Sequence, residues 1–273
     1  METNYPWYDG VWLRQYGQAK QIITAFCPER LEEFINKLSV FKTDTSFEVI
    51  EYKAIFTDEK LAEVKQFVNT IKMNEYEKQE FLSFGRLIKH DLPYFTQLQR
   101  ELTATMSQIV GQEVEPCYNF LSLYNNFGIC NVHMDAPSAK WTLDVCIDQS
   151  DEWPIHFSQT VPWPEDFNYQ GDDWEAYIKN DPKHTFTSYA LKSGEALIFS
   201  GSSQWHYRDR IANRAKSNFC NLVFFHFIPK GTLELSHPKN WARIFGIHQL
   251  NEIVHKKSNH KYGFDELFIT QVI

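Results

Sequence analysis

Residues 117–135 read CYNFLSLYNNFGICNVHMD, and this stretch combines a strand, a turn and two potential metal ligands. The alternation and aromatic content of Cys117–Tyr124 are typical of a β-strand, and Asn125-Asn-Phe-Gly128 is a turn signal. His133 and Asp135 follow the turn. Because alternate residues of an extended chain point to the same side, both side chains can face one ion while Met134 points away.

A second segment supplies a third potential ligand. Gly194-Glu-Ala-Leu-Ile-Phe-Ser-Gly201 indicates an apolar strand ending at a polar turn, so we expect His206 at the rim of a barrel. Two imidazoles and one carboxylate on one face of Fe(II) leave the opposite face open, which suits an oxygen-activating enzyme. An H-x-D pair alone is weak evidence, because such pairs also occur by chance. The alternative to a metal site is that these histidines are surface or hydrogen-bonded residues.

Composition limits the classes of function. The 273 residues fit one large domain, and 43% hydrophobic and 16% aromatic content suffice for a packed core. The net charge of −8 argues against broad nucleic-acid binding. We find neither a signal peptide nor an apolar run that could span a bilayer, so we expect a cytoplasmic protein without a membrane role.

The cysteines fit a reducing compartment. There are five of them, an odd number, at wide spacings and without a C-x-x-C motif. A disulfide scaffold or a zinc ribbon is therefore not expected, and reduced thiols are the favoured interpretation.

The first part of the chain, residues 1–115, is predicted to be mainly helical. Residues 31–38, with Pro28 in the first turn, residues 61–71, with Asp58 as the cap, and residues 94–110, ended by Gly111, show helical spacing of apolar side chains. The segment Val40–Phe56 is expected to hold one or two strands.

A jelly roll is predicted from residue 116 to residue 230. Many short strands with turns between them favour that architecture. The strands are expected at residues 117–124, 141–147, 153–157, 186–191, 196–200 and 218–227. Residues 158–185 form a long acidic and aromatic insertion, and residues 231–273 a helical extension with a helix starting near Pro238. The fold class is α+β, a cupin-like double-stranded β-helix supported by N-terminal helices, in a single domain.

The stretch Cys117–Phe227 resembles the core of the Fe(II)- and 2-oxoglutarate-dependent dioxygenases, particularly their prolyl-hydroxylase-like branch. The resemblance depends on the order, spacing and flanks of a set of residues taken together. These are Leu123-Tyr124, Gly128, His133-Met-Asp135-Ala-Pro137, Gly194-Glu-Ala-Leu-Ile-Phe199, Gly201 and His206, with a basic residue before the last strand.

The resemblance implies that His133, Asp135 and His206 bind iron. It also implies that a basic residue eight to ten positions beyond His206 pairs with the distal carboxylate of 2-oxoglutarate. Arg214 and Lys216 compete for this role. Arginine offers a two-pronged grip and lysine a point charge, and the spacing of the prolyl-hydroxylase-like branch favours Lys216.

Three further side chains are candidates for contact with the co-substrate. Tyr124 resembles the family's tyrosine that hydrogen-bonds the co-substrate, although it could also be a core aromatic with a satisfied hydroxyl. Arg208 and Arg210 are weaker candidates for the co-substrate and are expected on a solvated rim.

The implied activity is hydroxylation of an unactivated C–H bond, using Fe(II), 2-oxoglutarate and O2, with ascorbate as an optional addition. A carboxylate at position 135 disfavours halogenation, because the related halogenases have a small residue there. The implied substrate is a small amino-acid-like molecule or biosynthetic intermediate. The acidic insertion, as a lid, would suit a cationic amino acid, and the alternative is a solvated loop whose aromatic residues are anchored in the core.

Other functions stay open. The enzyme could hydroxylate a residue of a peptide or protein. A non-catalytic, cupin-like ligand-binding protein and an interaction module that docks a partner through its helices are the alternatives from other classes. The sequence does not specify the oligomeric state.

Overall fold

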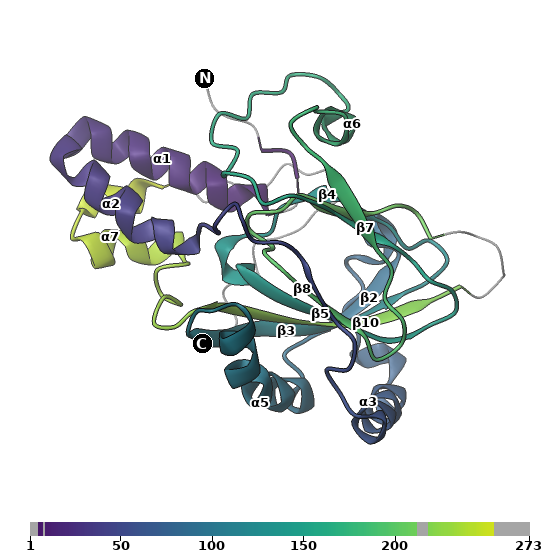
Figure 1. The fold of residues 1–273 in the computed structure, drawn as a ribbon. Coiled ribbons are helices and arrows are strands. Elements are labelled where there is room, and N and C mark those ends of the chain that lie inside the picture. The colour runs from purple at the N-terminus through teal and green to yellow at the C-terminus, as the bar shows by residue number, and fades with distance from the viewer. Residues whose placement is uncertain (1–4, 8, 212–217, 254–273) are drawn as a thin grey trace.

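The core of the protein is a pair of antiparallel sheets that pack face to face (Figure 1). A computed structural model describes residues 5–7, 9–211 and 218–253. The larger sheet has six strands in the order β1-β8-β5-β10-β3-β2, and the smaller has four in the order β4-β9-β6-β7. These elements confirm the predicted α+β fold with a jelly-roll core. The strands are β1 (Ile50–Tyr52), β2 (Arg86–His90), β3 (Val114–Tyr124), β4 (Cys130–His133), β5 (Trp141–Gln149), β6 (Ile155–Ser158), β7 (Phe186–Tyr189), β8 (Ala196–Phe199), β9 (His206–Arg208) and β10 (Cys220–Pro229).

Strand β10 lies in the middle of the larger sheet, paired with β3 on one side and β5 on the other. Its side chains alternate between two apolar clusters, as the two-residue period of a strand requires. Val223 and Phe225 belong to the cluster beneath the helices, whereas Leu222 and Phe224 belong to the cluster between the sheets. Both faces of the strand are therefore buried, which explains its almost continuous run of apolar residues.

Helices cover the outer face of the larger sheet and one end of the molecule (Figure 1). Helices α3 (Asp58–Thr70) and α5 (Pro93–Ile109) lie beneath the larger sheet, and Val64 and Phe95 reach its outer apolar cluster. Helices α1 (Gly10–Phe26), α2 (Leu31–Leu38) and α7 (Trp241–Phe245) gather at one end. The remaining helical segments are short, namely α4 (Phe81–Phe84), α6 (Trp174–Lys179), η1 (Pro28–Arg30), η2 (Ser39–Phe41), η3 (Met73–Glu75), η4 (Pro137–Ala139), η5 (Pro238–Asn240) and η6 (His248–Glu252).

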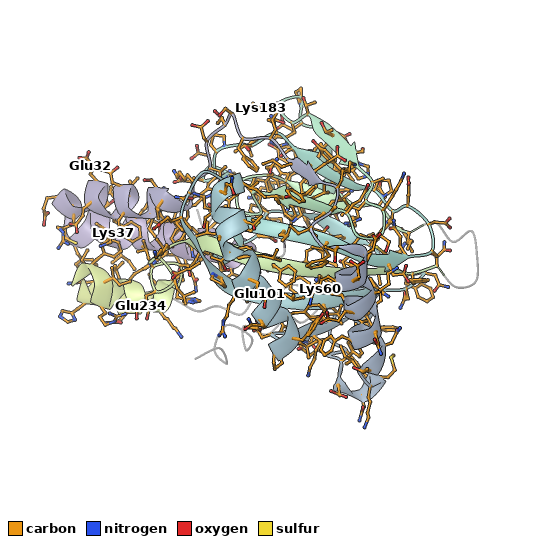
Figure 2. All side chains as sticks on the ribbon, turned by 60° about the horizontal axis from the view of Figure 1, so that its bottom comes forward. Glu32, Lys37, Lys60, Glu101, Lys183 and Glu234 are labelled. Carbon is orange, nitrogen blue, oxygen red and sulfur yellow. The ribbon has the colours of Figure 1, made fainter. Side chains whose placement is uncertain are left out.

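Charged side chains lie around the outside of these helices (Figure 2). Glu32, Glu101 and Glu234 are exposed. Among the described residues, we find no helix with the length and apolar character needed to cross a membrane.

The predicted helices at residues 31–38, 61–71 and 94–110 are confirmed with small shifts of their ends. The predicted cap of α3 was wrong, because the hydroxyl of Thr57, not Asp58, accepts the hydrogen bond from the Lys60 N–H. The segment Val40–Phe56 contains only one short strand, β1. The helix expected near Pro238 is present as η5 and α7, which end at Phe245, and η6 follows at His248–Glu252. Residues 254–273 lie outside the described residues.

The insertion packs on the outer side of the smaller sheet. Its side chains Trp163, Phe167 and Ile178 share one apolar cluster with Val132 and Met134, the residues that alternate with His133 and Asp135 along the chain. The aromatic residues of the insertion therefore cover the back of the histidine-bearing strand.

Two acidic residues of the insertion, Asp172 and Asp173, directly precede its short helix α6. The Asp173 carboxylate accepts a hydrogen bond from the Ala176 N–H and so caps α6, and Asp172 is exposed. The structure does not place either carboxylate beside the histidines.

The packing around β10 gives the first prediction. Phe225 is fully buried between β10, α3 and α5. We expect Phe225→Ala to lower the free energy of unfolding by about 3–5 kcal/mol, because it removes buried area and leaves a cavity. Phe127→Ala is the control, since that side chain is 61% exposed, and it should change stability by less than about 0.5 kcal/mol. Equal losses of stability in urea denaturation would contradict the assignment of the core.

Candidate metal centre

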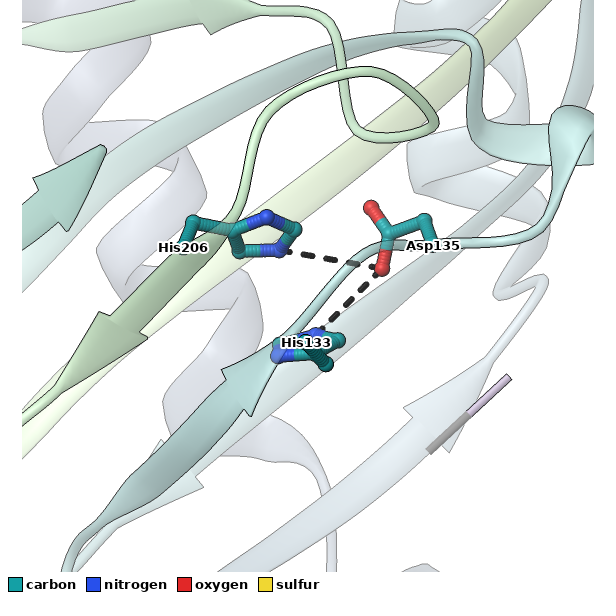
Figure 3. A group of neighbouring side chains, drawn as sticks. All are labelled: His133, Asp135 and His206. Atoms are coloured by element: carbon teal, nitrogen blue, oxygen red, sulfur yellow. Dashed lines mark ion pairs between the residues drawn. The ribbon is translucent and has the colours of Figure 1, made fainter. Parts of the chain in front are cut away.

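His133 and His206 face each other across neighbouring strands of the smaller sheet. Strand β4 pairs antiparallel with β9, and the two histidines are direct partners in this register. Their ring centroids lie 4.1 Å apart. Asp135 follows two residues after His133, and its carboxylate turns back toward both rings (Figure 3). The structure thus brings together the three side chains that the sequence singled out.

The three side chains converge on one point. The Asp135 Oδ1 atom lies 3.4 Å from His133 Nε2 and 3.7 Å from His206 Nε2, and all three potential ligand atoms lie within 4.8 Å of one another. These separations exceed those of good hydrogen bonds. They suit atoms that share one ion, which would lie between them.

Backbone carbonyls fix the orientation of both imidazole rings. The Nδ1 atom of His133 lies 2.8 Å from the carbonyl oxygen of Asn131, and the Nδ1 atom of His206 lies 3.0 Å from that of Gln204. Since a carbonyl only accepts, each Nδ1 is assigned as the protonated donor, and each Nε2 keeps its lone pair for a metal ion. Ligand histidines in metalloproteins are usually held in this way.

Asp135 is held by the turn that follows β8. Its backbone N–H donates to the Gly201 carbonyl over 2.9 Å. A Cβ atom on Gly201 would lie 2.2 Å from Asp135 Oδ2 and 2.6 Å from the Ala139 carbonyl oxygen. The carboxylate therefore occupies space that only glycine leaves open.

Burial and mutual charge set the protonation of the three groups. Burial and the neighbouring His133 lower the pKa of His206 to about 4. Burial raises the pKa of Asp135, but His206 and His133 outweigh it and hold that pKa well below its usual range. Cys130 and Asp135 raise the pKa of His133 despite its burial.

Of the three residues predicted to bind the co-substrate, the structure describes Tyr124. Tyr124 is buried, and its hydroxyl accepts a hydrogen bond from Arg86 Nη1 over 2.6 Å. Arg214 and Lys216 lie outside the described residues.

The prediction that Arg208 lies on a solvated rim was wrong. Arg208 is buried, with Nη2 2.8 Å from Asp144 Oδ2 and Nη1 donating to the Trp153 carbonyl. It lies two residues after His206, so the alternation of β9 turns it inward. Arg210 is exposed, and it donates to the Phe127 carbonyl over 3.1 Å.

Sequence reasoning did not single out Asp9, a carboxylate close to the metal loop. Asp9 accepts a hydrogen bond from the Ala136 N–H over 3.2 Å. Its φ of 52° is the left-handed conformation that aspartate tolerates better than most residues. Burial, together with the charge of Asp135, raises the pKa of Asp9 to about 7. No motif in the sequence pointed to this contact.

His226 lies on the inner face of the larger sheet. It is 3% exposed, its Nδ1 lies 3.0 Å from Thr142 Oγ1, and its ring stacks on Tyr118 with centroids 4.2 Å apart. The Nε2 atom has no hydrogen-bond partner among the described residues. Burial lowers the pKa of His226 to about 3. The imidazole is therefore neutral at physiological pH.

No protein-family model and no curated protein sequence matches the chain. Solved structures do match it. The non-haem α-ketoglutarate-dependent carbocyclase SnoK from nogalamycin biosynthesis is 9% identical, with a TM-score of 0.52 over 66% of this chain and 80% of SnoK. The chain shares the fold of SnoK. The predicted likeness to the 2-oxoglutarate-dependent oxygenases is therefore confirmed for the fold.

Two further structures have lower TM-scores. HygX from Streptomyces hygroscopicus, with nickel and 2-oxoglutarate bound, is 12% identical with a TM-score of 0.48 over 72% of this chain and 87% of HygX. The apoform of EctD from S. alaskensis is 12% identical with a TM-score of 0.48 over 66% of this chain and 72% of EctD. None of the three singles out the prolyl-hydroxylase-like branch.

The contact between Gly201 and Asp135 gives a prediction. We expect Gly201→Ala to weaken Mn(II) binding at least about tenfold, because the new methyl group displaces the carboxylate. Gly17→Ala is the matched control, since a Cβ there meets nothing within 4 Å and should leave Mn(II) affinity unchanged. Mn(II) titration monitored by electron paramagnetic resonance measures both. Equal affinity in the two variants would show that Asp135 does not contact the ion.

The buried neutral His226 gives a prediction for stability. Its pKa falls from an ordinary 6.5 to about 3 on folding, so between these pH values the unfolded chain binds more protons than the folded chain. Stability therefore falls as the pH falls below 6.5. The contribution of His226 to this loss is about 2 kcal/mol between pH 7 and pH 5.

His226→Gln should remove that contribution. Urea denaturation at the two pH values compares the variant with the unsubstituted protein. An equal loss of stability in both proteins would contradict the assignment of a neutral buried imidazole.

Proposed function

We propose that this protein is a non-haem Fe(II)- and 2-oxoglutarate-dependent dioxygenase. The observation that carries the proposal is the convergence of two imidazole Nε2 atoms and one carboxylate oxygen inside a jelly roll. Two histidines and one carboxylate with open positions are the ligand set of non-haem Fe(II) oxygenases. In the ranges 5–7, 9–211 and 218–253, no other group of His, Cys, Asp and Glu side chains meets the same geometric condition.

The residues present fit such an ion. Each imidazole is anchored through Nδ1, and each Nε2 points toward the Asp135 carboxylate. Asp135 supplies one negative charge, which offsets part of the charge of a divalent cation. All three ligands lie on neighbouring backbone segments that the sheet and the Gly201 turn hold in place, so little reorganisation accompanies binding.

The surroundings of the ligands exclude water on one side. Phe199 and Phe157 pack against His206, with ring centroids 5.2 and 5.7 Å from the imidazole. Both phenylalanines are buried. When bound, Fe(II) with 2-oxoglutarate and O2 supplies the oxidising power to attack a C–H bond. The task of the chain is then to hold the ion, orient the keto acid and keep bulk water away.

Tyr124 is the proposed hydrogen-bond donor to the keto acid. It lies on the inner face of β3 and is 3% exposed. Because its oxygen accepts a bond from Arg86, its own proton is available to a ligand. Lys216 and Arg214 stay candidates from the spacing argument.

The proposal also covers the reaction and the substrate. Position 135 carries a carboxylate where the related halogenases have a small residue, so we propose hydroxylation. We propose a small amino-acid-like substrate, with residues 1–273 as one catalytic domain around the core at residues 116–230. The insertion gives no support to a cationic substrate, because Trp163 and Phe167 pack behind β4 and the Asp173 carboxylate caps α6.

The test is an anaerobic titration of the purified protein with Fe(II) and 2-oxoglutarate. A chelated keto acid on Fe(II) gives a weak visible charge-transfer band, and we expect one equivalent of each to saturate it. His133→Ala should abolish the band because it removes a ligand. His156→Ala is the matched control, since His156 instead contacts Ser188 through Nδ1, and it should retain the band.

Admission of O2 to the loaded protein should then release succinate. Absence of both the band and succinate in the unsubstituted protein would reject the dioxygenase and favour a cupin-like binding protein.

A further inference from the structure

A buried guanidinium lies beside Tyr124 and comes from a strand that the sequence did not predict. Arg86 opens β2 and is the direct partner of Tyr124 in the antiparallel register, so both side chains lie on the same face of the larger sheet. Arg86 is 7% exposed. Its guanidinium carbon lies 4.9 to 5.4 Å from the ring centroids of Phe84, Phe120 and Tyr124.

The hydrogen bonds of Arg86 hold the guanidinium in one orientation and leave part of it available. Its Nε donates to the Glu80 carboxylate, and Nη1 donates to the Tyr124 hydroxyl over 2.6 Å. No hydrogen bond from Nη2 occurs within the part of the chain that the structure describes. A guanidinium carries five N–H donors, so several remain for a ligand, next to the free proton of Tyr124.

Such a fork of donors matches a carboxylate. Arginine binds carboxylates through two parallel N–H bonds, and these bonds are stronger because both partners are charged. The rings around the guanidinium and the Glu80 contact fix its plane in advance, so less conformational freedom is lost on binding.

An unpartnered hydroxyl lies next to this pair. Ser122 is the neighbouring residue of β3 on the same face as Tyr124, and it is fully buried. Its Oγ has no hydrogen-bond partner among the described residues. Buried polar atoms in folded proteins are nearly always paired. The hydroxyl therefore indicates a polar ligand in this part of the interior.

The second buried guanidinium between the sheets is not comparable. Both terminal nitrogens of Arg208 are taken, Nη2 by Asp144 and Nη1 by the Trp153 carbonyl. Each of its terminal nitrogens is already directed at a protein acceptor. Of these two guanidinium groups, Arg86 is the one with a terminal nitrogen, Nη2, that makes no hydrogen bond among the described residues.

We propose that Arg86, together with Tyr124, holds the distal carboxylate of the 2-oxo acid co-substrate. The inference rests on the proposed function. It places the basic residue that binds the distal carboxylate on β2. The sequence pointed instead to Lys216 or Arg214, beyond His206.

The experiment compares two keto acids of equal chain length. Anaerobic calorimetric titration of the Fe(II)-loaded protein with 2-oxoglutarate and with 2-oxopentanoate, which lacks the distal carboxylate, gives two Kd values. The variant is Arg86→Met combined with Glu80→Gln, so that the charged partner of the guanidinium is removed together with it. We expect the Kd for 2-oxoglutarate to rise about 30-fold, which is about 2 kcal/mol. The Kd for 2-oxopentanoate should stay within about threefold.

The matched control removes the other buried ion pair. Arg208→Met combined with Asp144→Asn should leave the Kd for 2-oxoglutarate within about threefold. Arg86→Lys keeps the charge but not the fork, and it should weaken 2-oxoglutarate about tenfold, which is about 1.4 kcal/mol. Thermal melts of each variant check that it is folded, and Arg86→Lys carries the test if the double variant is not.

Two results would overturn the inference. One is an unchanged Kd for 2-oxoglutarate in the Arg86 variants, and the other is an equal loss for both keto acids. A selective loss in Lys216→Ala or Arg214→Ala, with Arg86→Lys unchanged, would assign the anchor to that residue. If the unsubstituted protein binds neither keto acid, the proposed function itself fails. If it binds both and only the Arg86 variants contradict expectation, the proposed function stands.

Discussion

The pairing of β4 with β9 is the constraint on which the rest of the structure depends. It places His133 opposite His206. The hydrogen bond from each Nδ1 to a backbone carbonyl then turns both Nε2 atoms toward the Asp135 carboxylate. A shift of one residue in this register would turn one imidazole to the other face of the sheet, where the insertion packs. The geometry of the site is therefore a property of the sheet, not of three independent side chains.

The larger sheet is packed on both of its faces. Strand β10 is buried on both faces, and its outer apolar side chains join those of α3 and α5 in one cluster. Between the sheets, polar groups replace part of the apolar packing, namely the pair of Arg208 with Asp144 and the pair of Arg86 with Glu80. Buried ion pairs contribute little net stability. The placement of the Arg86 pair next to Tyr124 is better explained by a polar ligand than by stability.

Local patterns predicted much of the fold and the three convergent side chains. Alternation identified most strands of the jelly roll, and the H-x-D spacing works because an extended chain repeats every two residues. Contacts between residues that are distant in the sequence were not predictable from local patterns. Arg86 meets Tyr124 across 38 positions, and nothing in either local sequence specifies that β2 joins the sheet edge. Arg208 was misplaced for the same reason, because its buried partner Asp144 lies 64 positions away. Helix α1 has no side-chain cap that would have marked its start.

The central claim is that His133, Asp135 and His206 hold one metal ion through two Nε2 atoms and a carboxylate oxygen. Anomalous diffraction at the manganese edge, from crystals grown with Mn(II), tests it most directly. The account predicts one strong anomalous peak between these three side chains, with Nδ1 of each imidazole still directed at its backbone carbonyl. A peak elsewhere, or none at saturating Mn(II), would contradict it.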